Sequence, residues 1–329
     1  PLNPLLLGTD LKSVPIKTGS VGFQLAPRNN AAGRLDNAGK GVRLLITDDE
    51  KEAMDIAREL DRGNIERQRL ERDILSEAVE IIQDSQFKIQ EKKAIVLARE
   101  GWHPGVIGIV ASRLIDRYHR PTVVISLKDG AGKGSARGIH KFHILDALKE
   151  CEGFLEKYGG HKMAAGLTIS GKNIQPFESA FYNLASKNLN FEDLVPEVTL
   201  DSYIALAELN EKIIQEMELL APFGLANPAP LLGARDANIV QSKGVGNNHL
   251  KLKIREGAGA QEFNGSSENS SIPRPPGPLT PIFFDGIAYG KGAIHPLQGT
   301  NFDIAFIPYI DEWNGNRNLK LKVKEINRA

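Results

Sequence analysis

The sequence predicts a chain of the α/β class that ends in a small β-barrel. Three observations carry this prediction. Residues 93–187 alternate short apolar strands with amphipathic helices, which is typical of a sheet covered on both faces. A long charged helix precedes this region. After Pro196 the pattern changes to short strands separated by turn residues, which favours a barrel.

Composition places the chain among ordinary globular proteins. It has 329 residues, of which 41% are hydrophobic and 25% are charged, enough for two or three domains. No apolar run reaches the roughly 18–20 residues of a membrane helix, and the apolar start lacks the basic flank of a signal peptide. A single cysteine, Cys151, excludes an internal disulfide. We expect a cytoplasmic protein with no membrane partner, whose nucleic-acid binding must come from local basic clusters because the net charge is zero.

A long helix is expected from about residue 49 to residue 86. A helical pattern starts at Leu44, and Thr47, Asp48 and Asp49 are candidate caps. Apolar residues then recur mostly every three or four positions, with dense Glu and Arg between them: Ala53, Ala57, Leu60, Leu70, Ile74, Ala78 and Ile81. Such a largely solvated helix often connects two lobes.

The remaining elements follow from the same periodicities. The α/β region is expected to hold strands at Lys93–Ala98, Pro121–Leu127 and Leu167–Ile169, and helices at Val106–Tyr118, Phe142–Tyr158 and Ile174–Lys187. The barrel region is expected to hold a helix at Leu209–Leu220 and strands near Val198–Tyr203, Pro230–Val240, His249–Arg255, Ile282–Ala288, Phe302–Pro308 and Leu319–Ile326. Residues 257–281 are rich in Gly, Ser and Pro, so we expect a disordered loop inserted into the barrel.

Two clusters of arginines could hold a phosphate. Arg28 and Arg34 are six positions apart with Asn30 between them, and a guanidinium matches the oxygens of a phosphate. Ser135 and Arg137 are two apart in a Gly-rich stretch, so they lie on one side of an extended chain. The open alternatives are arginines in salt bridges with nearby acids and a Gly-rich turn with a solvated arginine.

Two further clusters combine a histidine with glycines. Trp102 and His103 stand in a turn before a helix, where free backbone N–H groups favour anions. Gly159 and Gly160 precede His161, and glycines let a backbone approach a ligand closely. The alternatives are structural: a turn with a packed tryptophan, and a histidine that serves packing.

Two strands of the barrel carry basic residues in alternation with aliphatic ones. Period two places each basic set on one strand face. The sets are Lys251, Lys253 and Arg255, preceded by His249, and Lys320, Lys322 and Lys324. A basic groove with aromatic residues is typical of single-strand binders. Tyr289, Tyr309 and Trp313 are candidates for base stacking, although core packing is the commoner role of an aromatic in a small barrel.

The sequence offers no cluster for metal-dependent hydrolysis. Hydrolysis of a phosphodiester by metal ions needs several carboxylates and usually histidines around the ions. No Asp-His-His triplet or Asp-x-Asp pair occurs, and the seven histidines are scattered. We therefore predict no catalytic residue and no metal ligand in this chain.

Taken in order, these motifs resemble the RecJ family of the DHH phosphoesterase superfamily. The similar segments are residues 26–34 (end of the DHH domain), 59–71 (connector), 101–113, 134–137 and 159–166 (DHHA1 domain) and 219–228 (start of the OB-fold domain). The resemblance implies a remnant of an α/β DHH domain in residues 1–48 and a connector helix in 49–86. It further implies an α/β DHHA1 domain in 87–192 and an OB-fold β-barrel in 193–329.

The resemblance also implies an activity, a 5′→3′ exonuclease on single-stranded DNA in recombination and repair. It would use Mn²⁺ or Mg²⁺, with single-strand-binding protein and a helicase as further partners. Arg28 or Arg34, Ser135 and Arg137 would hold the 5′-phosphate. His161 and its glycines would contact the nucleotide near the scissile bond, and the barrel lysines would grip the strand.

The sequence departs from the family at the metal ligands, which lie in N-terminal motifs. Leu7-Gly8-Thr9-Asp10 is similar to one of them, but the sequence that follows does not match, so Asp10 is not assigned as a ligand. We expect a partial chain, inactive alone, that supplies DNA and phosphate binding. The alternative is a non-catalytic single-strand-binding module. A short-oligonucleotide or cyclic-dinucleotide phosphodiesterase lacks the connector and the barrel, and an alanyl-tRNA-editing module needs zinc ligands that are missing here.

Overall fold

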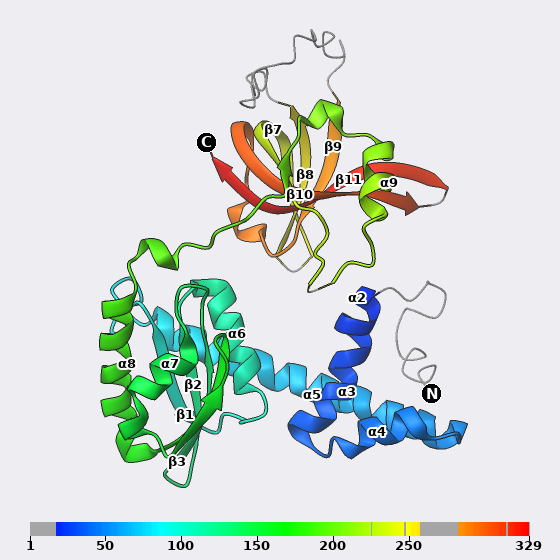
Figure 1. Cartoon of the computed structure of the whole chain (residues 1–329). Coiled ribbons are helices and arrows are strands. Elements are labelled where there is room, and N and C mark those ends of the chain that lie inside the picture. Colours follow the sequence, from blue (N-terminus) through cyan, green and yellow to red (C-terminus); the bar gives the residue numbers. More distant parts are fainter. Residues whose placement is uncertain (1–17, 225, 247, 257–281, 314, 329) are drawn as a thin grey trace. The chain divides into compact units, whose positions relative to one another are not determined.

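The computed structural model in Figure 1 describes residues 18–224, 226–246, 248–256, 282–313 and 315–328. The chain forms two compact units, residues 1–196 and 197–329. Asp10 and the expected insert at 257–281 lie outside the described residues. None of the helices in the described ranges combines the length and apolar character that a membrane crossing requires.

The first unit begins with helices that pack on a 34-residue helix, α5 (Glu50–Gln83). α3 (Ala26–Leu35) and α4 (Gly39–Ile46) pack directly on it, and Leu25 of the π-helical turn η2 (Val21–Leu25) joins their core. α2 (Thr18–Ser20) precedes η2 and buries no residue. The side chain of Asp49 accepts the backbone N–H groups of Lys51 and Glu52, so Asp49 is the cap among the three candidates. The helical pattern that starts at Leu44 belongs to α4, because the chain is extended at Thr47.

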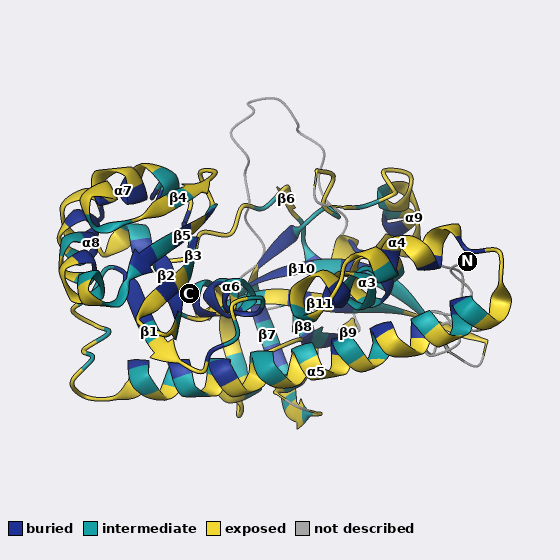
Figure 2. Cartoon of the chain, turned by 90° about the horizontal axis from the view of Figure 1, so that it is seen from below, coloured by how far each residue is buried: buried dark blue, intermediate teal, exposed yellow. Residues whose placement is uncertain are grey.

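Helix α5 connects two cores, as the sequence predicted for a helix between lobes. Its first half packs Ala53, Ala57 and Leu60 against α3 and α4. Its second half packs Ile74, Ala78 and Ile82 against the sheet that follows. Figure 2 shows buried residues recurring along α5 between exposed ones, which is the pattern of an amphipathic helix.

The sheet of the first unit is mixed and has the order β1-β2-β3-β5-β4. Its strands are β1 (Ile95–Glu100), β2 (Thr122–Lys128), β3 (Ala131–Arg137), β4 (Lys157–Gly160) and β5 (Ala164–Ser170). β1 and β2 are parallel, and the other neighbours are antiparallel. α6 (Ile107–Tyr118) and α5 cover one face, while α7 (Ile144–Glu150) and α8 (Ile174–Asn188) cover the other. The short turns η3 (Glu152–Phe154), η4 (Gly171–Asn173) and η5 (Glu192–Leu194) complete the unit.

Two sequence-based assignments in this sheet were wrong. The expected helix Phe142–Tyr158 is α7 followed by η3, and its last two residues belong to β4. β3 was not assigned as a strand, because Gly132 and Gly134 lower its strand propensity. A Cβ at either glycine would lie within 3 Å of Ile169 or Leu167 side-chain atoms, so glycine is required by the close packing of β3 on the core.

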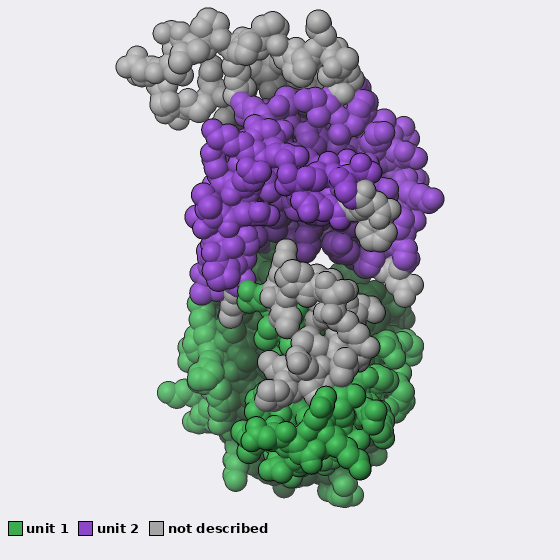
Figure 3. All heavy atoms as spheres, turned by 90° about the vertical axis from the view of Figure 1, so that its right-hand side faces the viewer, with its two compact units in different colours: residues 1–196 green, residues 197–329 purple. Residues whose placement is uncertain are grey.

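The second unit contains a closed five-stranded barrel, as the sequence predicted. Its strands are β7 (Leu232–Val245), β8 (His249–Glu256), β9 (Phe283–Ala288), β10 (Gly299–Trp313) and β11 (Asn316–Arg328). They follow the order β7-β8-β9-β11-β10, and β10 returns to pair with β7. The smaller elements are β6 (Ser202–Tyr203), η6 (Leu206–Glu208), α9 (Glu211–Glu218) and η7 (Gly292–Ile294). Figure 3 colours this unit separately from the first.

Candidate phosphate and nucleic-acid interface

Arg137 lies in the first unit, at the end of β3, and is partly buried without a carboxylate partner among the described residues. Its Nη1 donates to Ser135 Oγ and to the carbonyl oxygen of Ala136, both at 2.9 Å, and its Nε donates to Ser112 Oγ at 3.2 Å. Burial, and then the nearby charge of Arg34, lower the pKa of Arg137. A guanidinium nevertheless stays protonated, so Arg137 is a cation. No carboxylate among the described residues neutralises its charge.

A second arginine reaches the same place from α3. Arg34 and Arg137 both line a cavity of about 190 Å³, together with Gly108, Ile109, Ser112, Arg113 and Asp116. Arg34 is held there by a hydrogen bond from its Nη1 to the carbonyl oxygen of Gly105 at 3.3 Å. The cavity lining contains three guanidiniums, one hydroxyl and one carboxylate. Arg113 forms ion pairs with Glu71 and Asp116, so Arg34 and Arg137 are the two arginines of this lining that could bind an anion.

Two glycines make this convergence possible. A Cβ at Gly105 would lie 2.1 Å from the backbone oxygen of Arg34, so only glycine lets α3 come this close. A Cβ at Gly108 would lie 2.9 Å from Arg137 Nη2 and 3.0 Å from Ser135 Oγ. Gly108 therefore leaves the space in which the hydroxyl and the guanidinium meet.

The turn before α6 is held by Trp102 and His103. Trp102 is only 4% exposed, and its Nε1 donates to Glu77 of α5 at 2.9 Å. The ring nitrogen Nδ1 of His103 accepts the backbone N–H of Gly105 at 3.1 Å. Both side chains thus support the turn that carries Gly105, and we assign neither of them a contact with nucleic acid.

The arginines of α3 have separate roles. Arg28 donates from Nε to Asp61 of α5 at 2.8 Å and from Nη1 to the carbonyl oxygen of Gln24 at 2.7 Å. The salt-bridge alternative therefore describes Arg28, while Arg34 lines the cavity that also contains Arg137. Asn30 lines a second, larger cavity, which also contains Arg34.

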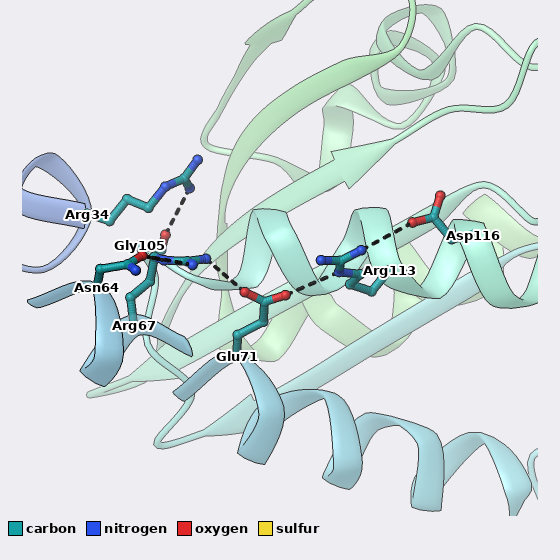
Figure 4. A network of polar contacts seen from close by, with 7 residues as sticks. All are labelled: Arg34, Asn64, Arg67, Glu71, Gly105, Arg113 and Asp116. Atoms are coloured by element: carbon teal, nitrogen blue, oxygen red, sulfur yellow. Dashed lines mark hydrogen bonds and ion pairs between the residues drawn. The ribbon is translucent and has the colours of Figure 1, made fainter. Parts of the chain in front are cut away.

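This larger cavity has a volume of about 520 Å³, and four of its ten lining residues are arginines. It is lined by Phe23, Pro27, Asn30, Arg34, Arg67, Gln68, Glu71, Arg72, Ile109 and Arg113. Figure 4 shows that Glu71 of α5 joins two of the arginines. It accepts from Arg67 at 2.8 Å and from Arg113 of α6 at 3.2 Å. Arg67 and Arg113 were not predicted as site residues. The sequence feature that could have indicated them is that each is an arginine in a helical segment that resembles the RecJ family, Arg67 in α5 and Arg113 in α6.

An open platform lies on the sheet beside the arginine cavities. Ser135 pairs with Gly166, which pairs with Gly159, so the three residues form one row across β3, β5 and β4. A Cβ at Gly159 would meet no atom within 4 Å, so this side of the sheet is open at that strand. The platform borders a cavity of about 420 Å³ that is lined by Pro104, Ile107, Lys133, Gly134, Ser135, Lys157, Tyr158, Gly166, Leu167 and Thr168.

Gly160 and His161 lie at the turn between β4 and β5. Gly160 has a φ of +153°, and a Cβ there would lie 2.3 Å from the carbonyl oxygen of Ala164. The backbone N–H of His161 donates to that same oxygen at 2.7 Å. The His161 side chain is exposed, and the structure does not bring it into the lining of the arginine cavities.

The basic strands of the barrel share one face. β9 lies between them and pairs with both, so Lys251, Ile287 and Lys322 form one row, and Lys253, Asp285 and Lys320 form the next. Arg255 pairs with Phe283 at the end of the face.

The charges of this face are not equally available. Lys320 is paired with Asp311, whereas Lys251, Lys253 and Lys322 have no carboxylate partner in the described part of the chain. Burial, and then the charge of Lys322, lower the pKa of Lys324. Lys243 of β7 lies opposite Lys251 and extends the face. It was not predicted as part of the face because the expected strand ended at Val240, whereas β7 continues to Val245.

A metal ion does not fit the residues that the structure describes. No group of three or more His, Cys, Asp or Glu residues comes together within those ranges. The residues that do converge are arginines and hydroxyls, which suit an anion. We assign no chemical step to a metal on these residues.

Comparison with known proteins finds a matching family model for a part of each unit. A family model described as the DHHA1 domain matches residues 91–187, and one described as the RecJ OB domain matches residues 200–270. The chain is 34% identical over 312 residues to the single-stranded-DNA-specific exonuclease RecJ of Bacillus subtilis, and 32% identical over 323 residues to that of Escherichia coli. The crystal structure of RecJ from Thermus thermophilus in complex with Mg²⁺ matches all of the chain with a TM-score of 0.79 at 28% identity.

The chain carries the DHHA1 and OB domains of the RecJ family. The match to the Bacillus protein includes 93% of this chain but only 36% of the Bacillus protein. The match to the Escherichia protein includes 52% of that protein. The Thermus structure is likewise matched over 46% of its chain. Arg113, Ser135 and Arg137 lie within the DHHA1 match, and Lys251 and Lys253 lie within the RecJ OB match.

Proposed function

We propose that this chain binds the 5′ end of single-stranded DNA within a RecJ-type 5′→3′ exonuclease. The terminal phosphate would lie between Arg34 and Arg137, with the hydroxyl of Ser135 as a neutral donor. The observation that carries this proposal is that Arg137 is partly buried, has no carboxylate partner among the described residues, and lines the same cavity as Arg34. A dianionic phosphate would supply the missing negative charge.

Other surfaces of each unit would receive the rest of the strand. The glycine row Ser135–Gly166–Gly159 offers an open floor for the first nucleotide, and the basic face of the barrel offers cations for the phosphates further along. The named relatives are single-stranded-DNA-specific exonucleases, and two related crystal structures contain Mg²⁺ or Mn²⁺. The cofactor of the proposed enzyme would be Mg²⁺ or Mn²⁺, and we assign no ligand for it to the described residues. Single-strand-binding protein and a helicase remain the proposed protein partners.

The test is binding of oligonucleotides that differ only at the 5′ end. Arg137→Ala should weaken binding of a 5′-phosphorylated strand by about ten- to a hundredfold, because charge-assisted hydrogen bonds contribute about 1.5–3 kcal/mol. Binding of the 5′-hydroxyl strand should change little. Arg137→Lys should restore only part of the loss, since an ammonium keeps the charge but not the planar fork.

The matched control is Arg117→Ala, which removes an exposed arginine from the last turn of α6, outside the cavity lining. It should leave the preference for the 5′-phosphate unchanged. An equal loss on both oligonucleotides, together with a lower melting temperature for Arg137→Ala, would show that Arg137 only braces the end of β3.

A further inference from the structure

The aromatic ring of Tyr289 stands exposed at the end of β9, beside the basic face of the barrel. Its exposed fraction is 55%, so it contributes little to the core. Lys322 Nζ lies 5.5 Å from the ring centroid, and the His249 ring meets it edge-on at 5.1 Å with an interplanar angle of 74°. The ring is thus flanked by basic side chains on an open surface.

The turn around Tyr289 is tied to the start of β8 by hydrogen bonds. The backbone N–H of Gly290 donates to His249 Nδ1 at 3.2 Å, and Asn248 Nδ2 donates to the carbonyl oxygen of Gly290 at 3.2 Å. Gly290 has a φ of +72°, a conformation that favours glycine. These contacts order the turn that carries Tyr289, and the His249 ring packs against the tyrosine ring, so less freedom remains to be lost on binding.

The surroundings of Tyr289 indicate what it would bind. The row Lys251–Ile287–Lys322 runs beside it, and neither lysine has a carboxylate partner in the described ranges. Cations beside an exposed, pre-oriented aromatic ring match a polymer that alternates negative charge with flat aromatic groups. Single-stranded nucleic acid has that composition, whereas a protein partner that satisfied the lysines would need acidic residues beside an aromatic one.

We propose that Tyr289 forms a nucleobase-stacking site on the barrel, with His249 and Lys322 fixing the ring beside the phosphate track. An unpaired base of single-stranded DNA stacks on the ring, while the adjacent phosphates contact Lys251 and Lys322. This inference rests on the proposed function, because it requires that the barrel binds single-stranded DNA. It adds a contact to the base, which the lysines alone do not provide.

The experiment compares Tyr289→Ala with Tyr289→Phe in the full 329-residue chain, using oligo-dT and the same oligomer with all bases removed. Tyr289→Ala should weaken binding of oligo-dT by roughly five- to a hundredfold, the usual range for loss of one stacked base. The slope of log affinity against log salt should not change, because no phosphate contact is lost. Tyr289→Phe should bind as the wild type does, and neither variant should affect binding of the abasic strand.

The outcomes separate the inference from the function on which it rests. If the wild-type chain binds no single-stranded DNA, both fail. If it binds and lysine substitutions weaken binding while Tyr289→Ala does not, only the stacking site is overturned. Equal losses on normal and abasic strands with a lower melting temperature would assign Tyr289 to stability, and tighter binding of an acidic peptide than of oligo-dT would assign the surface to a protein.

Discussion

Single residues decide which arginines can meet a phosphate. The sequence placed Arg28 and Arg34 in one candidate clamp, but six residues turn a helix by about 600°, which leaves two side chains on different faces. Arg28 therefore reaches Asp61 of α5, and Arg34 reaches Gly105 and the cavity. Their spacing could not assign these roles until the neighbours of α3 were known.

Gly108 gives the sharpest test at this scale. In Gly108→Ala the new methyl group would meet the ends of the Arg137 and Ser135 side chains, which can move without disturbing the backbone. We expect the preference for 5′-phosphorylated strands to fall severalfold, while the melting temperature changes little. Binding of the two oligonucleotides and a thermal melt measure these effects.

Gly63 provides the control, since a Cβ there would meet nothing within 4 Å. Gly63→Ala should keep the phosphate preference and stabilise the exposed helix by about 0.5–1 kcal/mol. If Gly108→Ala retained the full preference, the meeting point of Arg137 and Ser135 would not be the phosphate site.

At the scale of elements, α5 and α6 are joined by a nearly buried carboxylate. The side chains of Glu71 and Arg67 are 12% and 11% exposed. Removing Glu71 would leave Arg67 with the amide oxygen of Asn64 as its remaining side-chain acceptor and would release Arg113 from α5. We expect Glu71→Ala to lower the free energy of unfolding of the first unit by about 1.5–3 kcal/mol, as measured by urea denaturation.

The neighbouring exposed pair is the natural comparison. Glu66 binds Arg69 on the same helix but is solvated, so Glu66→Ala should have little effect on unfolding. If Glu66→Ala and Glu71→Ala were equally mild, the carboxylate of Glu71 would not be an important tie between the two helices.

The elements themselves were predictable to different degrees. Period-two alternation identified the barrel strands, and period 3.6 identified α5, α6 and α8, because each has a clear apolar side. β3 and β4 were not predicted as strands, because glycines replace the side chains that would show alternation. Gly159 of β4 is also part of the open platform, so one residue that obscured a strand belongs to the candidate site.

At the scale of the whole molecule, the sequence could not show that its two basic strands share a surface. Their union depends on β9, which pairs antiparallel with β8 and parallel with β11. Periodicity reports which face of a strand is solvated, but pairing between segments distant in sequence leaves no periodic signal. The arginine site has the same origin, because Arg34 and Arg137 come together only through the packing of α3 and β3 near α6.

The most direct test of the central claim, that this chain binds single-stranded DNA, is the salt dependence of binding. Lys251, Lys253 and Lys322 have no carboxylate partner among the described residues, so each should contact a phosphate. Replacing all three by Ala should weaken binding uniformly across sequences and reduce the slope of log affinity against log salt by about 2, at about 0.7 per contact.

The matched control replaces three exposed lysines of the first unit, Lys149, Lys172 and Lys187, and should keep the wild-type slope. We expect tight, steeply salt-dependent binding by the wild type and a flatter dependence only for the barrel variant. Identical slopes for the wild type and both variants, or binding that does not respond to salt, would contradict it.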